Sequence, residues 1–344
     1  MSAAAVPVLA VDGLQVEFAT RAGTVRAVRG AGYAVAAGRT LAVVGESGCG
    51  KSVTLQAVMG LIDSPPGRIT GGSARLLGRE LLGLPARELD RLRGATVGMI
   101  FQDPMSALNP LMRVGDQIAE ALVAHRGMSR RTALARAVEL LERTRIPAAR
   151  ERARQYPFEF SGGMLQRVMI AIALACRPAL LIADEPTTAL DVTVQAQILH
   201  LMRELQRKTG TALLFITHDM GVIAEMCDAV VVMYAGRVVE RRPVVELFEA
   251  PRHPYTRGLL DSIPRKGVAH KAELPTIEGT VPSLLHPPPG CRFADRCRHH
   301  AALDVVSQRR CREQDPVLRA DGSGDGEGWV ACHFPLAASV GGGT

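Results

Sequence analysis

Apolar and polar positions follow two different periods along this chain, and the change between them predicts an architecture. Short runs rich in valine, leucine and alanine predict buried strands at 39–44, 97–101, 180–183, 213–217 and 229–234. Spacings of three and four residues predict helices at 52–62 and 194–208. The valine-rich segments 9–18 and 25–35 predict further strands. Strands that alternate with helices imply an α/β fold with a parallel sheet.

One long helical block interrupts this alternation. From 104 to about 177 the apolar residues recur at spacings of three and four, as at Ile118, Leu122, Leu134, Val138 and Leu141. The block is inserted between two predicted strands, so we expect it to form a subdomain of its own. Beyond residue 262 the composition changes again, and proline and glycine become frequent.

Composition narrows the class of protein. Of the 344 residues, 47% are hydrophobic and 22% charged, so the chain can bury a core. No stretch of 18 uncharged apolar residues exists, and we expect no membrane span. Residues 1–10 lack a basic leading region, so no secretory signal is expected. Aromatic residues are only 4%, too few for an obvious platform that stacks single-stranded nucleic acid.

The net charge of +7 is concentrated in one segment. Residues 125–154 hold nine arginines and three glutamates, while the tail from residue 263 is nearly neutral. Two interpretations stay open. The segment is a solvated, arginine-rich helical face, or it is a surface that lies near lipid headgroups or an acidic partner.

The strongest motif for chemistry is Gly45-Glu-Ser-Gly-Cys-Gly50-Lys51-Ser52, which matches the pattern G-x-x-x-x-G-K-[ST] between a predicted strand and a predicted helix. Its glycines let backbone N–H groups converge on phosphate oxygens, and the helix N-terminus adds a favourable dipole. Lys51 reaches the β- and γ-phosphates, and the Ser52 hydroxyl can bind Mg²⁺. We predict a nucleotide-phosphate site here.

Two carboxylates end the predicted strand at 180–183. Asp184 is placed to hold Mg²⁺, and Glu185 to polarise or deprotonate an attacking water. Paired acids at a strand end can also form a turn or a helix cap, but the phosphate motif on the same chain favours the catalytic interpretation.

The segment Phe160-Ser161-Gly162-Gly163-Met164-Leu165-Gln166 resembles the signature of ABC transporter ATP-binding subunits, and it lies about 20 residues before the paired acids, as that family requires. The resemblance covers roughly residues 8–262. It implies a P-loop NTPase cassette: a RecA-like core, an antiparallel β subdomain and an inserted helical subdomain. Phe160 and Met164 depart from the commonest signature, but Ser161 and the two glycines, which would clamp a γ-phosphate, are present.

The resemblance also assigns roles to single positions. Gln102 resembles the glutamine that contacts Mg²⁺ or water and couples to membrane subunits, Asp191 the D-loop aspartate, and His218 the switch histidine. Phe18 resembles the aromatic that stacks on adenine. The implied catalytic residues are Lys51, Gln102, Glu185 and His218, and the implied Mg²⁺ ligands are Ser52, Gln102 and Asp184. The implied nucleotide-binding residues are Phe18, Gly45, Glu46, Ser47, Gly48, Cys49, Gly50, Lys51, Ser52, Val53, Gln102, Ser161, Gly162, Gly163, Asp184, Asp191 and His218.

The cargo and the partners are likewise implied by resemblance. Residues 102–110, 160–164 and 250–260 resemble the dipeptide/oligopeptide (and nickel) importer branch. This implies a subunit that powers peptide import, with a nickel or other small-solute importer as the alternative. Because one chain carries one phosphate loop and one signature, the family arrangement is a head-to-tail dimer with a second ATPase subunit. Two transmembrane permease subunits and an extracytoplasmic binding protein complete the expected assembly, at the cytoplasmic face of the cell membrane.

Four of the seven cysteines lie in the tail: Cys291, Cys297, Cys311 and Cys332. Their spacing lacks the close pairs of common zinc sites, and disulfides conflict with a cytosolic ATPase. Gly290-Cys-Arg-Phe-Ala-Asp-Arg-Cys297 resembles tails that carry a [4Fe–4S] cluster in some peptide-importer ATPases. The resemblance implies that cluster; zinc, helped by His299, His300 and His333, and unliganded thiols stay open.

The expected organisation is therefore an ATPase cassette at 1–262, with its helical subdomain at about 104–178, and a cysteine-containing tail at 263–344. ATP and Mg²⁺ are the expected cofactors. A rival class, a soluble ABC protein that acts on nucleic acid, is supported only by the positive charge. The chain lacks the long coiled-coil insertion and the tandem cassettes of such relatives, so we expect no nucleic-acid partner.

Overall fold

The computed structural model describes residues 6–188, 190–263, 275–322 and 328–337. Contacts divide the chain into two compact units. The first unit comprises Met1–Ala10, Ala34–Thr40 and Ala74–Thr217, and the second comprises Val11–Tyr33, Leu41–Ser73 and His218–Thr344. Each unit mixes strands and helices, as the sequence predicts for an α/β protein, and each is described by itself below.

The first unit contains three parallel strands in the order β8–β7–β6. Their bounds are β6 (Val97–Ile100), β7 (Leu180–Asp184) and β8 (Ala212–Ile216). Strand β8 is buried at every position, and β7 at every position except its terminal aspartate. Continuous apolar runs of this kind belong to strands that are covered on both faces, which is typical of parallel sheets. The predicted strands are confirmed to within one residue at each end.

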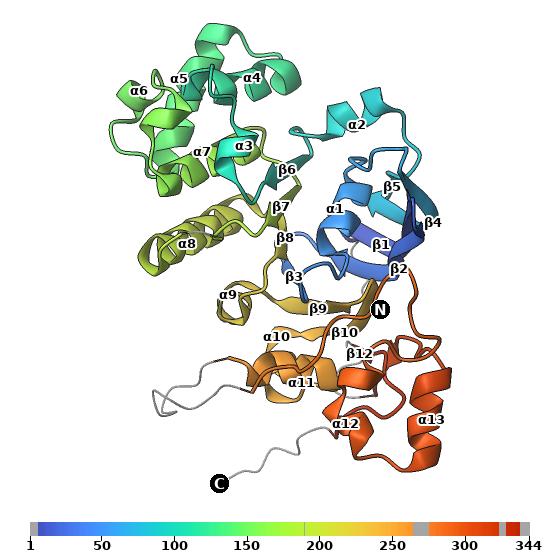
Figure 1. The fold of residues 1–344 in the computed structure, drawn as a ribbon. Helices are drawn as coiled ribbons and strands as arrows, with labels where there is room; N and C mark the ends of the chain where they lie inside the picture. The colour runs from blue at the N-terminus through green and yellow to red at the C-terminus, as the bar shows by residue number, and fades with distance from the viewer. Residues whose placement is uncertain (1–5, 189, 264–274, 323–327, 338–344) are drawn as a thin grey trace. The chain divides into compact units, whose positions relative to one another are not determined.

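The inserted segment of the first unit is helical, as predicted (Figure 1). Ile118, Leu122 and Leu141 are buried as the apolar spacing predicted. Leu134 and Val138 are only half-buried, because Ala133, Ala137, Leu140 and Leu141 form the buried face of their helix. Ser129 caps one helix by accepting a hydrogen bond from the Thr132 N–H, and the left-handed Gly127 ends the helix before it. The helices and turns of this unit are α2 (Ala86–Leu92), α3 (Pro104–Ala107), α4 (Val114–Arg126), α5 (Arg130–Arg143), α6 (Ala149–Arg152), the 3-10 turn Pro157–Glu159, α7 (Gly162–Leu174) and α8 (Val192–Thr209).

The second unit contains strands in the order β11–β12–β10–β9–β3. β3 (Thr40–Val44) pairs in parallel with β9 (Ala229–Tyr234), and β9 pairs antiparallel with β10 (Arg237–Pro243). Helix α1 (Lys51–Val58) follows β3 after a short loop and ends earlier than the predicted 62, because Met59 and Gly60 form a turn. The β3 and β9 runs were predicted; β10 was not, because charged residues interrupt its apolar pattern.

A four-stranded sheet has the order β2–β1–β4–β5. The two predicted N-terminal strands are confirmed as β1 (Leu9–Thr20) and β2 (Gly23–Val35). Strand β4 (Gly67–Leu76) alternates buried and exposed positions near its end, and β5 (Arg79–Glu80) pairs antiparallel with it. Sequence analysis did not identify β4 and β5, since glycine and arginine break the alternation there.

The tail is built from short elements that pack on the second unit's sheet (Figure 1). Strand β12 (Trp329–Val330) pairs antiparallel with β10, and β11 (Arg319–Ala320) pairs with β12. The tail also contains the 3-10 turn Ala294–Arg296, α12 (Arg298–Ala301) and α13 (Val305–Glu313). The other helices of the second unit after β8 precede the tail: α9 (Met220–Met226), α10 (Val244–Glu249) and α11 (Pro254–Asp261). Within the described residues, no helix has the length and apolar character needed to cross a membrane.

Candidate active site

The loop that follows β3 has the backbone of a phosphate-binding loop. A Cβ on Gly45 would lie 2.1 Å from the Met233 carbonyl oxygen, so no larger residue fits at that position. Gly50 has φ 101° and sits against the Ala27 carbonyl, where a Cβ would lie 2.7 Å from the oxygen. Two of the three motif glycines are therefore required because neighbouring main-chain carbonyls leave no room for a Cβ.

Lys51 begins helix α1 and folds back over the loop. Its ammonium donates to the carbonyl oxygens of Gly45, at 2.6 Å, and Glu46, at 3.1 Å. The side chain is 8% exposed, while Ser47, Gly48 and Ser52 face solvent. The helix has no side-chain cap at Gly50, so its first N–H groups point into the loop. This is the arrangement that binds phosphate: convergent N–H groups, a helix dipole and one cation.

Cys49 lies under the loop and is 1% exposed. Its Sγ is 3.7 Å from the Lys51 ammonium. Burial raises the pKa of the Cys49 thiol, and the nearby lysine only partly offsets that effect. The thiol is therefore a packed, protonated group, and the backbone of Cys49, rather than its sulfur, belongs to the phosphate site.

The paired carboxylates stand at the carboxyl end of β7, in the first unit. Asp184 is the last residue of the strand, and Glu185 follows it with φ 46°. The Glu185 N–H donates to the Ile216 carbonyl at 2.9 Å, which anchors this left-handed residue to the end of β8. A non-glycine residue in that region of φ and ψ is uncommon and often marks a functional position.

Gln102 and Glu185 come together although they are 83 residues apart in sequence. Gln102 follows β6, and its Nε2 donates to Glu185 Oε2 at 3.2 Å. Thr188 donates its hydroxyl to the same oxygen at 3.0 Å. The predicted glutamine and the predicted general base therefore share one place at the carboxyl ends of two neighbouring strands. Thr188 was not predicted, and only its position three residues after Glu185 could have indicated it.

The signature segment begins helix α7. Ser161 is the N-cap residue, and within the described part of the chain its side chain makes no capping hydrogen bond. A Cβ on Gly163 would lie 2.6 Å from a methyl group of Val194, on α8. Asp191 caps α8 by accepting from the Val194 N–H at 2.9 Å. The glycine thus permits close packing of α7 on α8, and the D-loop aspartate has a structural partner.

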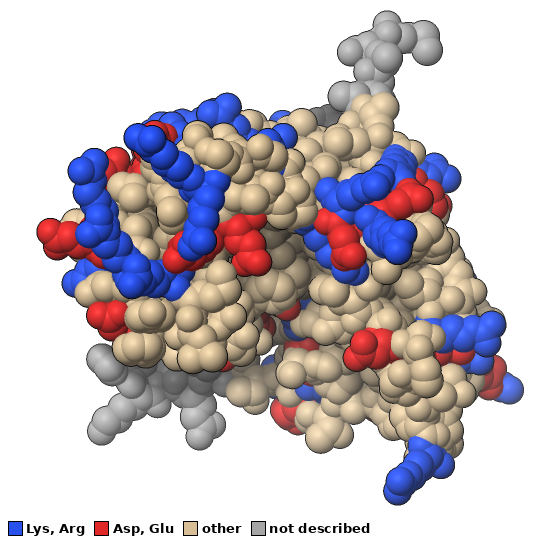
Figure 2. All heavy atoms as spheres, turned by 90° about the horizontal axis from the view of Figure 1, so that it is seen from above, with Lys and Arg blue, Asp and Glu red and all other residues tan. Residues whose placement is uncertain are grey.

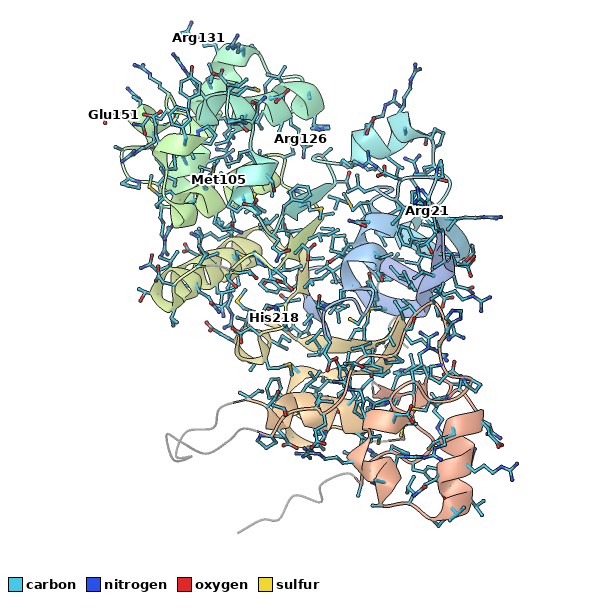
Figure 3. All side chains as sticks on the ribbon, in the orientation of Figure 1. Arg21, Met105, Arg126, Arg131, Glu151 and His218 are labelled. Atoms are coloured by element: carbon cyan, nitrogen blue, oxygen red, sulfur yellow. The ribbon has the colours of Figure 1, made fainter. Side chains whose placement is uncertain are left out.

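Two further predicted residues belong to the second unit. His218 lies two residues after the end of β8 and is exposed (Figure 3). Asp219 beside it caps α9. Phe18 lies on β1 and is half-buried, close to Gly67. The second unit therefore holds Phe18, the loop 45–53 and His218, whereas the first unit holds Gln102, Ser161–Gly163, Asp184, Glu185 and Asp191. The roles of these residues in one composite site remain predictions.

The four tail cysteines line one cavity, together with His299, His300 and His333. Burial raises the pKa of the Cys291 thiol to about 11 and that of Cys332 to about 12. Among the described residues, however, no three His, Cys, Asp or Glu side chains are grouped closely enough to hold a metal ion. The thiols match an iron–sulfur ligand set in kind and number, but their positions do not form one, so the structure does not support the expected cluster.

Two contacts of the phosphate loop, one with α11 and one with the tail, were not predicted from the sequence. The Glu46 N–H donates to the Tyr255 hydroxyl at 2.9 Å, and Arg296 forms an ion pair with the Glu46 carboxylate at 2.8 Å. Both residues lie in segments that the family resemblance had singled out, at 250–260 and 290–297. Nothing in the sequence alone linked those segments to the loop.

Comparison with known proteins agrees with this geometry. Residues 28–188 match the family model described as ABC transporter, and residues 239–302 match the oligopeptide/dipeptide transporter C-terminal region. The chain is 55% identical to the oligopeptide transport ATP-binding protein OppD of Salmonella typhimurium over 299 residues, covering 87% of this chain and 88% of that protein. It is 52% identical to the dipeptide transport ATP-binding protein DppD of Bacillus subtilis over 290 residues, covering 84% and 86%.

A solved structure extends the comparison to the fold. The dimeric, post-hydrolysis ATP-binding cassette MJ0796, bound to ADP and Pi, superposes with a TM-score of 0.62 at 26% identity. The match covers 69% of this chain and 98% of that one. The fold, the phosphate loop and the signature helix define an ATP-binding cassette with ATPase chemistry. More particularly, the chain belongs to the family of ABC transporter ATP-binding proteins of dipeptide and oligopeptide transport.

Proposed function

We propose that this chain is the ATP-hydrolysing subunit that powers import of dipeptides or oligopeptides through a membrane ABC permease. One observation carries the proposal: Gln102 and Glu185 meet at the carboxyl ends of β6 and β7 on a chain that also carries the phosphate loop. The tail that matches the oligopeptide/dipeptide transporter C-terminal region supports the peptide cargo.

The proposed chemistry is in-line attack of water on the γ-phosphate. Lys51 and the loop N–H groups bind the phosphates, and Ser161, Gly162 and Gly163 clamp the γ-phosphate from an opposing subunit. Glu185 polarises the attacking water, and Gln102 orients that carboxylate through its 3.2 Å hydrogen bond. His218 contacts the γ-phosphate. Phe18 stacks on adenine, and Asp191 belongs to the subunit contact.

Three of the proposed site residues carry oxygen donors of the kind that Mg²⁺ prefers: the Ser52 hydroxyl, the Asp184 carboxylate and the Gln102 amide oxygen. We propose that these groups hold the ion, directly or through water. When bound, Mg²⁺ neutralises charge on the β- and γ-phosphates. The exposed Ser52 and the half-buried Asp184 are accessible enough for that role.

The proposed assembly follows from the content of one chain, which carries one phosphate loop and one signature. Two cassettes, this chain and a paralogue, would pair head to tail so that each loop faces the other subunit's signature. The dimeric MJ0796 structure, an ATP-binding cassette of the same fold, supports this arrangement. Two permease subunits and an extracytoplasmic binding protein would complete the importer, with this chain peripheral on the cytoplasmic face of the membrane. The proposed cassette spans 1–262, its helical subdomain about 104–178, and the tail 263–344.

Purification of the assembled complex from membranes tests this function. We expect permease subunits to copurify, and vesicles that contain the complex to take up a labelled dipeptide when ATP is enclosed on the cassette side. Uptake of Ni²⁺ but not peptide would support the nickel-importer alternative. Copurification with nucleic acid and no permease would contradict the proposal and support the rival class.

For the tail, we propose that the four cysteines are the ligands of a [4Fe–4S] cluster, as the family resemblance implies. The support is the placement of all four thiols around one cavity. No step of ATP hydrolysis is assigned to the cluster. Anaerobically purified protein is expected to contain iron and acid-labile sulfide; stoichiometric zinc, or no metal at all, would overturn the proposal.

A further inference from the structure

Residues that follow β10 hold Glu46, the second residue of the phosphate loop, by both its main chain and its side chain: Tyr255 lies on α11 and Arg296 in the tail. Arg296 donates through Nη1 to Glu46 Oε2 at 2.8 Å and through Nη2 to Glu46 Oε1 at 3.2 Å, a bidentate pair. The Tyr255 hydroxyl accepts the Glu46 N–H at 2.9 Å. Loop residue Glu46 is therefore fixed at three points by residues outside the loop.

The Arg296 side chain is itself rigidly placed. Its Nε donates to the Glu278 carbonyl at 2.8 Å, and its Nη2 also donates to the Ile277 carbonyl at 3.2 Å. Nη1 donates further to the Tyr234 hydroxyl at 3.2 Å. The guanidinium is 8% exposed, so solvent screens the ion pair much less than a surface pair. Because its N–H groups donate to several fixed acceptors, the Arg296 side chain is held in one conformation.

Aromatic packing supports the same junction. Tyr255 and Tyr234 lie with ring centroids 4.6 Å apart, and Phe293 contacts both, at 5.3 Å and 5.2 Å. Tyr255 is fully buried, and burial raises the pKa of its phenol, so the hydroxyl stays neutral and can accept from the Glu46 N–H. The three rings pack against one another, and the Tyr255 hydroxyl connects them to the loop.

A second arginine of the same tail segment approaches the loop through the Ala235–Gly236 peptide. Arg292 donates to the Ala235 carbonyl, and the Gly236 N–H donates to the Cys49 carbonyl at 3.0 Å. The segment 291–297 thus contacts the loop at Glu46 directly and approaches it at Cys49 through Gly236. Both contacts act on the backbone that must present N–H groups to phosphate.

We propose that Arg296 is a positioning residue for ATP binding: its ion pair with Glu46 holds the phosphate loop in the conformation that accepts nucleotide. The tail would thereby control nucleotide affinity, although it lies outside the cassette motifs. This inference rests on the proposed assignment of residues 45–52 as the phosphate-binding loop. Arg296 acts through Glu46 and touches no reacting atom.

The test compares ATP dissociation constants by calorimetry for Arg296→Gln, Glu46→Gln and the double variant. We expect each single variant to weaken ATP binding roughly 5- to 20-fold, a normal range for coupling between distant groups. The double variant should be no weaker than the weaker single variant, because both changes remove the same ion pair. In the assembled complex, KM for ATP should rise while kcat changes little.

Arg298→Gln is the matched control. Arg298 lies two residues away, is largely exposed, and pairs with Glu278 instead of the loop. The Arg298→Gln substitution removes one positive charge from the tail, as Arg296→Gln does. It should leave ATP affinity within about twofold of that of the parent chain. Arg296→Lys keeps the charge but not the bidentate geometry, and it should restore affinity only in part.

Unchanged ATP affinity in a folded Arg296→Gln chain, or fully additive effects in the double variant, would overturn the inference. If Arg296→Gln does not fold, Glu46→Gln tests the inference instead, because that substitution leaves the tail intact. An ATP affinity like that of the parent chain in Glu46→Gln would also overturn the inference. Lys51→Ala separates the two claims. If that variant binds ATP normally, the loop assignment fails; if it loses ATP while the Arg296 variants do not, only the positioning role fails.

Discussion

At the residue scale, the catalytic interpretation depends on Glu185 more than on any other side chain. Its positive φ, its backbone bond to Ile216 and its contacts with Gln102 and Thr188 fix one carboxylate oxygen in place. A carboxylate that is oriented in this way can accept a proton from a water with little rearrangement. The neighbouring Asp184 is the last residue of β7, and its proposed role is to hold Mg²⁺.

The Glu185→Gln variant should therefore lose ATP hydrolysis and still bind ATP. We expect ATP hydrolysis by the assembled complex to fall roughly 100-fold or more, because a neutral amide cannot act as a base. ATP affinity, measured by calorimetry, should stay close to that of the parent chain. Glu204→Gln is the control, since Glu204 lies on the exposed surface of α8 and pairs with Arg145. Hydrolysis by Glu185→Gln at the parent rate would remove this residue from the catalytic role.

A second prediction at this scale concerns Cys49. Burial raises the pKa of its thiol, and the side chain is 1% exposed, so thiolate is scarce and hard to reach. We expect iodoacetamide at pH 7.5 to alkylate Cys49 at least about tenfold more slowly in the native chain than in denaturant. Mass spectrometry of the peptide that contains Cys49 gives both rates. Equal rates would show that the loop does not shield the thiol.

At the element scale, the tail is attached to the second unit's sheet by strand pairing and by buried charge. Strand β12 continues the sheet beside β10. On β10, Arg242 is 2% exposed and pairs with both Glu240 and Asp321. Burial raises the pKa of the Glu240 carboxyl, and the nearby hydrogen bonds oppose that effect. Charges buried to this degree are costly unless every partner is present.

Asp321→Asn should consequently destabilise the chain by about 3–5 kcal/mol, because Arg242 would lose a buried counter-charge. Chemical denaturation measures the change. Glu278→Gln, which breaks the exposed ion pair with Arg298, should cost less than about 1 kcal/mol and serves as the control. Equal effects of the two substitutions would mean that the Arg242 cluster does not hold the tail in place.

The elements that could be predicted are those whose apolar pattern is strong. Strands β3, β7, β8 and β9 are nearly continuous apolar runs, and their bounds follow from sequence to within one residue. Strand β10 and the tail elements escaped prediction, because ion pairs and short hydrogen-bonded turns stabilise them more than a periodic apolar face does. The site residues followed from motifs, whereas Arg296 and Tyr255 required a long-range contact that no local pattern encodes.

At the scale of the whole molecule, the charge is distributed unevenly. Arginine side chains gather over the helices α4–α6 of the first unit, and further basic side chains lie elsewhere on the same face (Figure 2). Several of these arginines are neutralised locally: Arg130 pairs with Asp116, Arg136 with Glu139, and Arg145 with Glu204. Others, such as Arg131, project outward (Figure 3). These ion pairs are consistent with a solvated, partly paired helical face, one of the two interpretations of the segment.

The central claim is that ATP hydrolysis at the 45–52 loop is coupled to peptide transport. The most direct measurement is phosphate release by the assembled importer in lipid vesicles, with binding protein and dipeptide present or absent. We predict that dipeptide stimulates the rate severalfold and that Lys51→Ala reduces both rates to background. A rate of phosphate release that does not change when dipeptide is added would contradict this claim. So would a rate in the Lys51→Ala variant equal to that of the parent chain.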